Sequence, residues 1–366
     1  MSALRSFRTV AALVATTLVL TACGGGGGEQ GERAEGKVAP AIADVTPAAD
    51  PRSYSGVINA EIADSAVVPV VENPTPALPA KVTDAQGNKV VVTDVSRILA
   101  LDLYGTLART VFELGLGDNV VGRDRSTTFP EAKDLPLVTP SAHDLNAEAI
   151  LALNPSVILS DTTLGPVDVL RQMEDSGIPV VWVESDRSLA NVGDLTRTTA
   201  TALGIPEAGE KLAARVDAEI AEVSAQIEAQ APADKNQRLR TIFLYARGNA
   251  GVYYMFGKGS AADDLIDSIG AYDVAEEIDW SGMKSVTSEG LVAAAPELIV
   301  MMTGGLESAG GVDGLLEKWP ALANTAAGQN KRIVTVADSL VLGYGPATAE
   351  VLNALAVAVI APEAFE

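Results

Sequence analysis

The sequence predicts an α/β protein with two lobes joined by one long helix. Short apolar strands alternate with amphipathic helical segments on both sides of residues 204–231, which is typical of sheets covered by helices. Within 204–231, apolar residues recur every three or four positions, so one continuous helix is expected there. A pattern that occurs once in each half of the chain further indicates two related lobes.

The first lobe is expected to span residues 81–203. It opens with a hairpin that turns at Gln86-Gly87-Asn88, followed by a helix over 104–114 that Gly115 caps. Its short apolar runs are expected to be buried strands of a parallel sheet, and they cover residues 97–101, 157–159 and 180–183.

The long helix begins with Pro206, which suits a first turn, and ends before Pro232. At about 1.5 Å per residue it would run roughly 35 Å, a stiff element rather than a loose linker. Strands and helices alternate again over residues 232–366, the second lobe. Its expected elements are strands at 241–245, 298–302 and 333–336 and a closing apolar helix at 347–360.

The internal repeat consists of residues 146–159 and 287–300. Each copy reads as a capped short helix with a glutamate in its first turn, then a proline and a buried strand. Agreement over about fourteen positions favours a duplicated lobe over a common helix-to-strand device met twice.

Cys23 is the only cysteine, and it follows a segment with the features of a secretory signal. Two arginines precede an apolar run over residues 10–20, which is too short for a spanning helix, and five glycines follow Cys23. The stretch 20–24 resembles the lipobox of bacterial lipoproteins, which implies a signal peptide over 1–22 and a lipid on Cys23. Residues 23–80, rich in Gly, Ala and Pro, are expected to form a flexible tether.

The formal charge of −22 argues against nucleic acid as a partner, since binding phosphates requires basic patches. It also argues against electrostatic attachment to anionic lipid, so the membrane link is expected to be the lipid on Cys23. With that cysteine lipidated, no thiol remains for disulfides, catalysis or metal binding.

The chain from about residue 81 to its end resembles the substrate-binding lipoproteins of ABC importers for ferric siderophores, cobalamin and haem. The resemblance implies two Rossmann-like lobes on a helical backbone (class III), and as partners an ABC permease with its ATPase subunits. It also implies that Glu148 and Glu289, the early glutamates of the repeat, dock on that permease, although each also suits a helix first turn electrostatically. The residues that carry it are the repeat and the stretches 97–101, 114–116, 120–122 and 257–260.

The histidine count restricts the ligand, because His143 is the only histidine. One histidine without an available cysteine cannot build a site for bare zinc or manganese, so a bound metal is expected inside a chelate. Histidine and tyrosine both ligate haem iron. Tyr245 ends the first strand of the second lobe, and Arg247 shares its face two residues on. A neighbouring arginine stabilises a phenolate on iron(III) or pairs with a haem propionate.

More closely, the chain resembles the His/Tyr haem-binding lipoproteins of Gram-positive haem importers. That resemblance implies haem b (haemin) as the transported ligand, His143 and Tyr245 as its axial ligands, and Arg247 beside them. It also suggests surface haem-binding proteins as partners that would pass haem to this protein. Weaker candidates for the pocket wall are Tyr272, Met301, Met302 and Tyr344.

Three alternatives stand beside this interpretation. A ferric-siderophore or cobalamin binder of the same fold would use Tyr245 and Arg247 but leave His143 without a role. An enzyme is disfavoured because the sequence has no nucleophile elbow, phosphate loop or metal-ligand spacing. A purely structural surface lipoprotein would leave the repeat and the long helix unexplained.

Overall fold

The first lobe contains a three-stranded parallel sheet in the order β5-β6-β7, as the apolar runs predict. These strands are β5 (Ile98–Leu101), β6 (Val157–Ser160) and β7 (Val180–Trp182), and every residue in them is buried. The predicted hairpin is β3 (Ala80–Thr83) with β4 (Lys89–Val92), paired antiparallel. In this computed structural model residues 36–62 and 66–366 are described; the predicted signal peptide and Cys23 lie outside that part.

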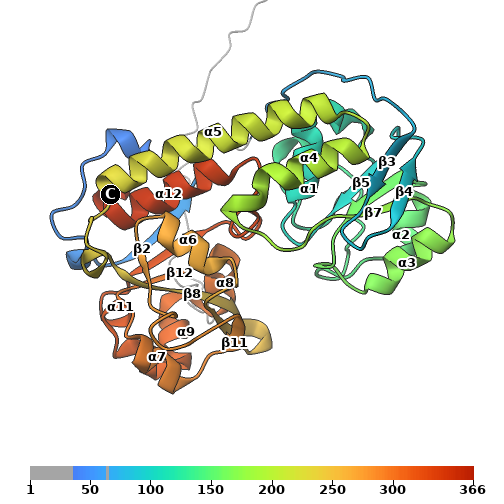
Figure 1. The fold of residues 1–366 in the computed structure, drawn as a ribbon. Helices are drawn as coiled ribbons and strands as arrows, with labels where there is room; N and C mark the ends of the chain where they lie inside the picture. Colours follow the sequence, from blue (N-terminus) through green and yellow to red (C-terminus); the bar gives the residue numbers. More distant parts are fainter. Residues whose placement is uncertain (1–35, 63–65) are drawn as a thin grey trace, which may run out of the picture. The chain divides into compact units, whose positions relative to one another are not determined.

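Helices accompany this sheet (Figure 1). The helix expected over 104–114 is shorter, because it continues as a π-helical turn, Phe112–Leu116. Gly115 ends it at φ +88°, and a Cβ there would lie 1.9 Å from the Val71 carbonyl oxygen, so glycine is required for two reasons. The helices are α1 (Thr106–Val111), α2 (Ala147–Ala152), α3 (Val167–Asp175) and α4 (Val192–Ala202).

The long helix is α5 (Pro206–Gln230), and it packs against α4 in the first lobe and α12 (Thr348–Ile360) in the second (Figure 1). Its apolar face is buried at the predicted positions apart from a half-buried Ile220. The buried Glu113 ties the first lobe to α5, since it pairs with Arg109 of α1 at 2.8 Å and with Arg215 of α5.

The second lobe is built on one mixed sheet in the order β1-β2-β13-β12-β8-β9-β11, with β10 beside β8. This sheet is mixed rather than wholly parallel, because β9 returns antiparallel to β8 as a hairpin and β11 pairs antiparallel with β9. The strands encoded in this half are β8 (Arg240–Arg247), β9 (Val252–Phe256), β10 (Tyr272–Asp273), β11 (Met283–Ser285), β12 (Leu298–Met302) and β13 (Ile333–Val336).

Helices pack on both faces of this sheet, and buried residues alternate between two apolar clusters along β8 and β12. Besides α12, the helices are α6 (Ala262–Ser268), α7 (Ser288–Ala294), α8 (Thr303–Ser308), α9 (Gly311–Lys318), α10 (Pro320–Ala323) and α11 (Ala326–Gln329). No helix of the described ranges is long and apolar enough to cross a membrane.

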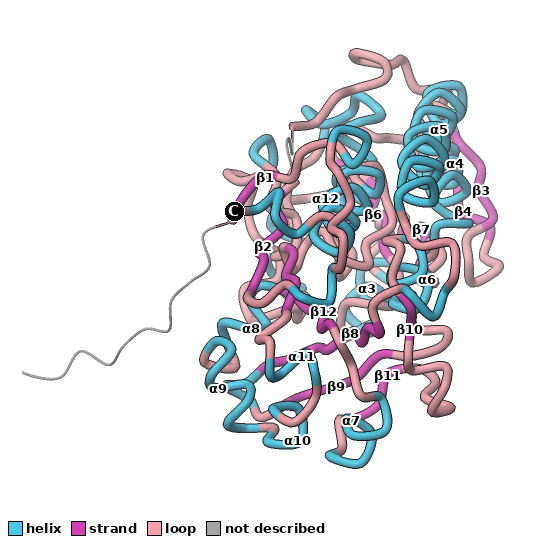
Figure 2. Tube along the Cα trace, turned by 90° about the vertical axis from the view of Figure 1, so that its left-hand side faces the viewer, coloured by secondary structure: helices cyan, strands magenta, loops and turns pink. Residues whose placement is uncertain are grey.

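The flexible tether expected over residues 23–80 has to be corrected. The described part of that segment, residues 36–62 and 66–80, belongs to the folded unit. β2 (Val57–Glu61) pairs parallel with β13 and buries Ile58 and Ala60, and β1 (Lys37–Val38) pairs with β2. β1 lies beside the C-terminus (Figure 2), where Lys37 donates to the Glu366 backbone oxygen. The prolines that suggested a tether lie outside β1 and β2, in loops and a 3₁₀ turn, where they break no ladder.

The repeat has the same local structure in both lobes. Asn146 caps α2 by accepting from the Ala149 N–H, and Thr287 caps α7 by accepting from the Gly290 N–H. Each helix then leads into a central buried strand, β6 or β12. The predicted correspondence of the two segments is therefore confirmed at the level of caps, helices and strands.

Candidate functional site

His143 lies in a loop of the first lobe that its neighbours hold in place. Asp144 donates from its N–H to the Ser141 oxygen, and the loop is bridged to Gly165. Arg125 fixes it further by donating from Nε to the Ala142 oxygen at 3.1 Å and from Nη2 to the Pro140 oxygen at 3.2 Å. The loop therefore presents the imidazole in a defined position.

The His143 side chain is half-buried, and its buried Nδ1 has no hydrogen-bond partner among the described residues. Burial lowers the pKa of His143 below its ordinary value, and the cations Arg247 and Arg125 lower it further. Asp338 and Asp144 oppose this shift. The imidazole is therefore neutral at neutral pH, which is the form that binds a metal ion.

Tyr245 and Arg247 are among the last three residues of the strand β8, and their side chains point to the same face of the sheet. The Arg247 guanidinium lies over the Tyr245 ring, 4.7 Å from its centroid. Tyr254 and Phe256 of the neighbouring β9 pack beside Tyr245 with ring centroids 6.3 Å and 6.2 Å away. An aromatic surface with one phenol and one cation thus lies at this edge of the sheet.

Asp338, which the sequence reading missed, completes this group. Its Oδ2 lies 3.2 Å from Arg247 Nη2, and its Oδ1 accepts from the Gly304 N–H at 2.8 Å. It follows β13 by two residues, so the only signal in the sequence was an acidic residue just past the end of a buried strand. Arg125 was missed as well, because its neighbours in the sequence do not indicate that it hydrogen-bonds the loop of His143.

The three principal candidates come from both lobes. His143 belongs to the first lobe, Tyr245 and Arg247 belong to the second, and the charge of Arg247 is one of the causes that lower the pKa of His143. Together the three side chains offer one nitrogen donor, one phenol oxygen and one cation. No cluster of three His, Cys, Asp or Glu side chains suited to a bare metal ion occurs in the described ranges.

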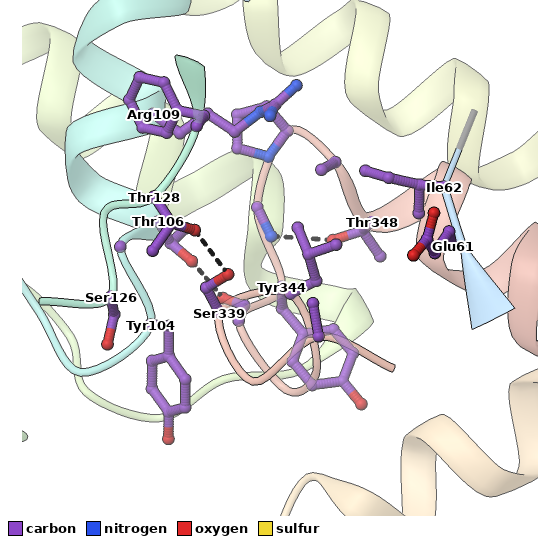
Figure 3. Close-up of a pocket in the computed structure, with 18 of the residues that line it drawn as sticks. Glu61, Ile62, Tyr104, Thr106, Arg109, Ser126, Thr128, Ser339, Tyr344 and Thr348 are labelled. Atoms are coloured by element: carbon purple, nitrogen blue, oxygen red, sulfur yellow. Dashed lines mark hydrogen bonds between the residues drawn. The ribbon is translucent and has the colours of Figure 1, made fainter. Parts of the chain in front are cut away.

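A cavity of about 400 Å³ adjoins this group between the lobes (Figure 3). Its walls come from the start of α1, the loop 126–129, the end of β2 and the loop 337–348. Thr128 and Ser339 point toward one another across it, with their hydroxyls 2.9 Å apart. His143, Tyr245 and Arg247 do not line it, but Ala337 and Ser339 do, and they flank Asp338.

Tyr104, also missed from sequence, lines the same cavity from the first lobe. The Arg187 guanidinium lies 5.7 Å from its ring centroid, and burial raises the pKa of its phenol. Beneath Tyr104, Arg187 bonds Asp161 at 2.6 Å and lies 3.6 Å from Asp102. The two carboxylates directly follow the carboxyl ends of β5 and β6, and with Arg187 they form a buried charged cluster near Tyr104.

The weaker candidates fall in different places. Tyr344 lines the cavity, but it is buried and its hydroxyl donates to the Ala261 oxygen at 2.5 Å. Met302 packs in the same apolar cluster as Tyr245, whereas Met301 is buried in the cluster on the other face of the sheet. Tyr272 pairs with Arg240, at the opposite end of β8 from Tyr245. Of the four, Met302 and Tyr344 belong to the apolar cluster against which Tyr245 packs.

The two glutamates of the repeat are exposed, Glu148 in the first turn of α2 and Glu289 in the first turn of α7. An exposed apolar residue follows each by three positions, Leu151 at 42% and Val292 at 62% exposure. The two lobes thus present matching surface features at equivalent helices.

Comparison with known proteins agrees with this architecture. The family model described as periplasmic binding protein matches residues 103–340, well over half of the chain. The chain belongs to the periplasmic binding protein family. Its two α/β lobes on one long helix are of the class III type, as predicted, and the family consists of binding proteins rather than enzymes.

Solved structures of similar chains include the haem-binding protein HmuT, at 43% identity and a TM-score of 0.80, over 85% of this chain and 99% of that one. HmuT variants were also solved in which an arginine, a histidine or a tyrosine is replaced by alanine, the tyrosine and arginine two positions apart. The periplasmic haem-binding protein RhuT from Roseiflexus sp. RS-1 is 36% identical, with a TM-score of 0.66, over 75% of this chain and all of that one.

Among curated proteins, an ABC transporter substrate-binding lipoprotein of Bacillus subtilis, YvrC, is 23% identical over 80% of this chain and 88% of its own length. A vitamin B12-binding protein of Vibrio campbellii is 27% identical over 34% of this chain and 44% of its own. The full-length similarities are thus to a substrate-binding lipoprotein and to haem-binding proteins.

Proposed function

We propose that this protein binds haemin between its two lobes and delivers it to an ABC permease for iron acquisition. His143 and Tyr245 are the axial ligands of the iron in this proposal, and Arg247 supports the tyrosine or pairs with a propionate. The transported ligand is haem b, Fe(III)-protoporphyrin IX. The observations that carry the proposal are the Tyr–Arg pair at the end of β8, with the guanidinium 4.7 Å from the ring centroid, and the half-buried His143 of the first lobe, whose Nδ1 has no partner among the described residues.

The chemistry of these side chains suits iron(III) in a porphyrin. A neutral imidazole offers a nitrogen lone pair without losing a proton first, and His143 is kept neutral by its surroundings. A phenolate oxygen is a strong ligand for iron(III), and the guanidinium over the Tyr245 ring stabilises its negative charge. Tyr254 and Phe256 add aromatic surface beside Tyr245, as a flat apolar macrocycle requires.

The similarity to HmuT supports the same assignment. That protein is named as haem-binding, and its solved variants replace a histidine, a tyrosine and an arginine, with the last two spaced as Tyr245 and Arg247 are. The identity of 43% extends over most of both chains, so the fold that positions these side chains is shared.

In this proposal, residues outside the haemin site deliver the haemin to the permease. A lipid on Cys23 anchors the protein to the outer face of the cell membrane. Glu148 and Glu289 then dock the two lobes on the permease, whose ATPase subunits drive release. One exposed carboxylate per lobe gives orientation and encounter rate rather than tight binding. Surface haem-binding proteins are candidate upstream donors.

The test is a haemin titration of the untagged chain expressed without residues 1–22. We expect one haemin per protein and a strong Soret band, with His143→Ala and Tyr245→Ala each changing the spectrum or weakening retention. Tyr272→Phe is the matched control, because Tyr272 lies at the far end of β8 and its loss should leave the spectrum unchanged.

The second candidate is a cobalamin or ferric-siderophore binder, favoured by the partial similarity to vitamin B12-binding proteins. Cobalamin or a ferric siderophore would then quench tryptophan fluorescence stoichiometrically, while haemin would give no saturable absorbance change. That pair of results would replace the haem proposal.

A further inference from the structure

We propose that Asp338 is a positioning residue that competes with the carboxylates of a bound ligand for Arg247, and so speeds release of the ligand. The inference rests on the proposed function of the site as a haemin site. It concerns a residue to which neither the sequence pattern nor the similar proteins assign a role. The argument depends on how Arg247 is held.

The polar atoms of Arg247 are partly committed within the protein. Its Nη1 donates to the Ala246 oxygen at 3.0 Å, and its Nη2 lies 3.2 Å from Asp338 Oδ2. A guanidinium binds a carboxylate best through two parallel N–H groups. A propionate that approaches Arg247 therefore meets a guanidinium that already has a carboxylate partner.

Asp338 is fixed in its position by contacts on both sides. Its Oδ1 accepts from the Gly304 N–H at 2.8 Å, at the start of α8. The next residue, Ser339, hydrogen-bonds Thr128 of the other lobe. Asp338 consequently cannot move away freely when a second anion arrives, and the two carboxylates must share or exchange one cation.

The Arg247–Asp338 pair is also of moderate strength, which suits exchange. The two side chains are 33% and 38% exposed, so solvent screens their attraction. A pair buried as deeply as Arg187 and Asp161, at 1% and 0% exposure, would not open at a comparable cost. Asp338 thus weakens the hold of Arg247 on the ligand without abolishing it.

Asp338 further balances charge near Tyr245. Arg247 lies over the Tyr245 ring, and the Asp338 carboxylate offsets part of its positive charge there. Removing that carboxylate leaves the full charge of Arg247 for the iron-bound phenolate and for a propionate. Both effects predict tighter holding of haemin when the charge of Asp338 is removed.

The test is the rate at which haemin leaves the preloaded, untagged protein for an excess of apomyoglobin. Asp338→Asn retains an acceptor for the Gly304 N–H but removes the charge, so we expect release to slow about two- to five-fold at low salt. The difference should shrink as ionic strength rises. In an Arg247→Ala background the same substitution should change the rate little, because the cation for which Asp338 competes is gone.

Two controls separate this role from a structural one. Ser339→Ala removes the neighbouring interlobe hydrogen bond and should leave the Asp338→Asn effect intact. The iron–phenolate charge-transfer band should move to shorter wavelength in Asp338→Asn, since an uncompensated guanidinium stabilises the phenolate electrons. A substitution that merely loosened the loop would not shift the band in this direction.

Faster release from Asp338→Asn, or an equal change in the Arg247→Ala background, would overturn the inference while leaving haemin binding in place. Failure of the unsubstituted protein to form a haemin complex would instead overturn the proposed function. The two failures are therefore distinguishable in one set of measurements.

Discussion

At the scale of single residues, the chain places its only histidine where it stays uncharged. Burial makes the largest contribution to lowering the pKa of His143, and the Arg247 and Arg125 guanidinium groups add to it. A nearby cation disfavours protonation of the imidazole, and the neutral ring keeps a nitrogen lone pair with which it can bind a metal ion. The same two arginines also help to position the site, since Arg125 hydrogen-bonds the loop of His143 and Arg247 lies over the Tyr245 ring.

This environment predicts a measurable titration. In the untagged protein the single imidazole gives one set of NMR signals, and its pKa should lie below 6.5. Arg247→Ala should raise that pKa, and Asp338→Asn should lower it, because Asp338 opposes the shift. Haemin retention should then fall as the pH drops through the lowered pKa, since protons compete with iron for the imidazole. A pKa above 6.5 would contradict the account of this site.

Asp102 predicts a second pH effect. Burial, with the nearby Asp124 and Asp161 carboxylates, raises the pKa of Asp102 to about 8. A raised pKa means that the folded state prefers the protonated acid, so this contribution to stability is complete below pH 3.8, the unfolded value, and is lost as the pH rises through about 8. Asp102→Asn cannot ionise, so its thermal midpoint should depend less on pH between 6 and 9. Parallel pH profiles for the two proteins would contradict this assignment.

The principal ligand candidates could be predicted at this scale because the chain has one histidine and one Tyr-x-Arg strand end. Asp338 and Arg125 could not, because their roles depend on contacts between loops that are distant in sequence. The positions of Met301 and Met302 could be predicted only in part. The alternation along a strand predicts that they face opposite ways, but only the sheet register shows which one shares the face of Tyr245.

At the scale of elements, the loop before α12 sets how closely the lobes approach. Thr106 of α1 donates from its hydroxyl to the Gly343 oxygen at 3.0 Å. A Cβ on Gly345 would lie 2.3 Å from the Thr106 methyl group. The absence of a side chain at Gly345 therefore permits this interlobe contact.

Gly345→Ala should destabilise the protein by about 1–3 kcal/mol through this overlap, measured as a lower thermal midpoint. Thr106→Ser removes the methyl group and keeps the hydroxyl, so adding it to Gly345→Ala should restore most of the loss. A Gly345→Ala protein as stable as the parent, or a double variant without recovery, would show that the contact does not limit the approach of the lobes.

Elements with strong local patterns were predictable, and those that depend on distant partners were not. The periodicity of α5 and the turn of the β3–β4 hairpin lie within the segments themselves. β2 is a short strand between proline-rich stretches, and its partner β13 lies near the other end of the chain. Residues 57–61 contain no signal for that pairing, so the sequence alone predicts a tether there.

At the scale of the whole molecule, the lobes are connected more closely than one helix implies. β2 belongs to the second lobe, whereas Val67 and Val70 already hydrogen-bond Glu131 and Glu113 of the first. The chain therefore passes from the second lobe to the first near residue 62 and returns through α5. Together with the Thr128–Ser339 hydrogen bond, these links favour small movements of the lobes over wide opening.

In the proposed function, docking on the permease depends on both lobes at once. Glu148→Gln with Glu289→Gln should leave haemin binding and thermal stability unchanged, because both side chains are exposed. Haemin-stimulated ATPase activity of the reconstituted importer should fall about ten-fold or more, from the loss of two charge contacts. Glu222→Gln, at an exposed glutamate of α5 outside the two repeat helices, is the control and should retain full stimulation. Equal activity of all three proteins would exclude docking through the two glutamates.

The central claim is that one iron is bound by His143 from the first lobe and Tyr245 from the second. Resonance Raman spectroscopy of the ferric haemin complex, excited in the iron–phenolate charge-transfer band, tests it most directly. The account predicts phenolate modes that are lost in Tyr245→Phe and kept in His143→Ala, with the EPR spectrum of the latter changed by loss of the nitrogen ligand. Phenolate modes that survive in Tyr245→Phe, or a complex indifferent to both substitutions, would contradict it.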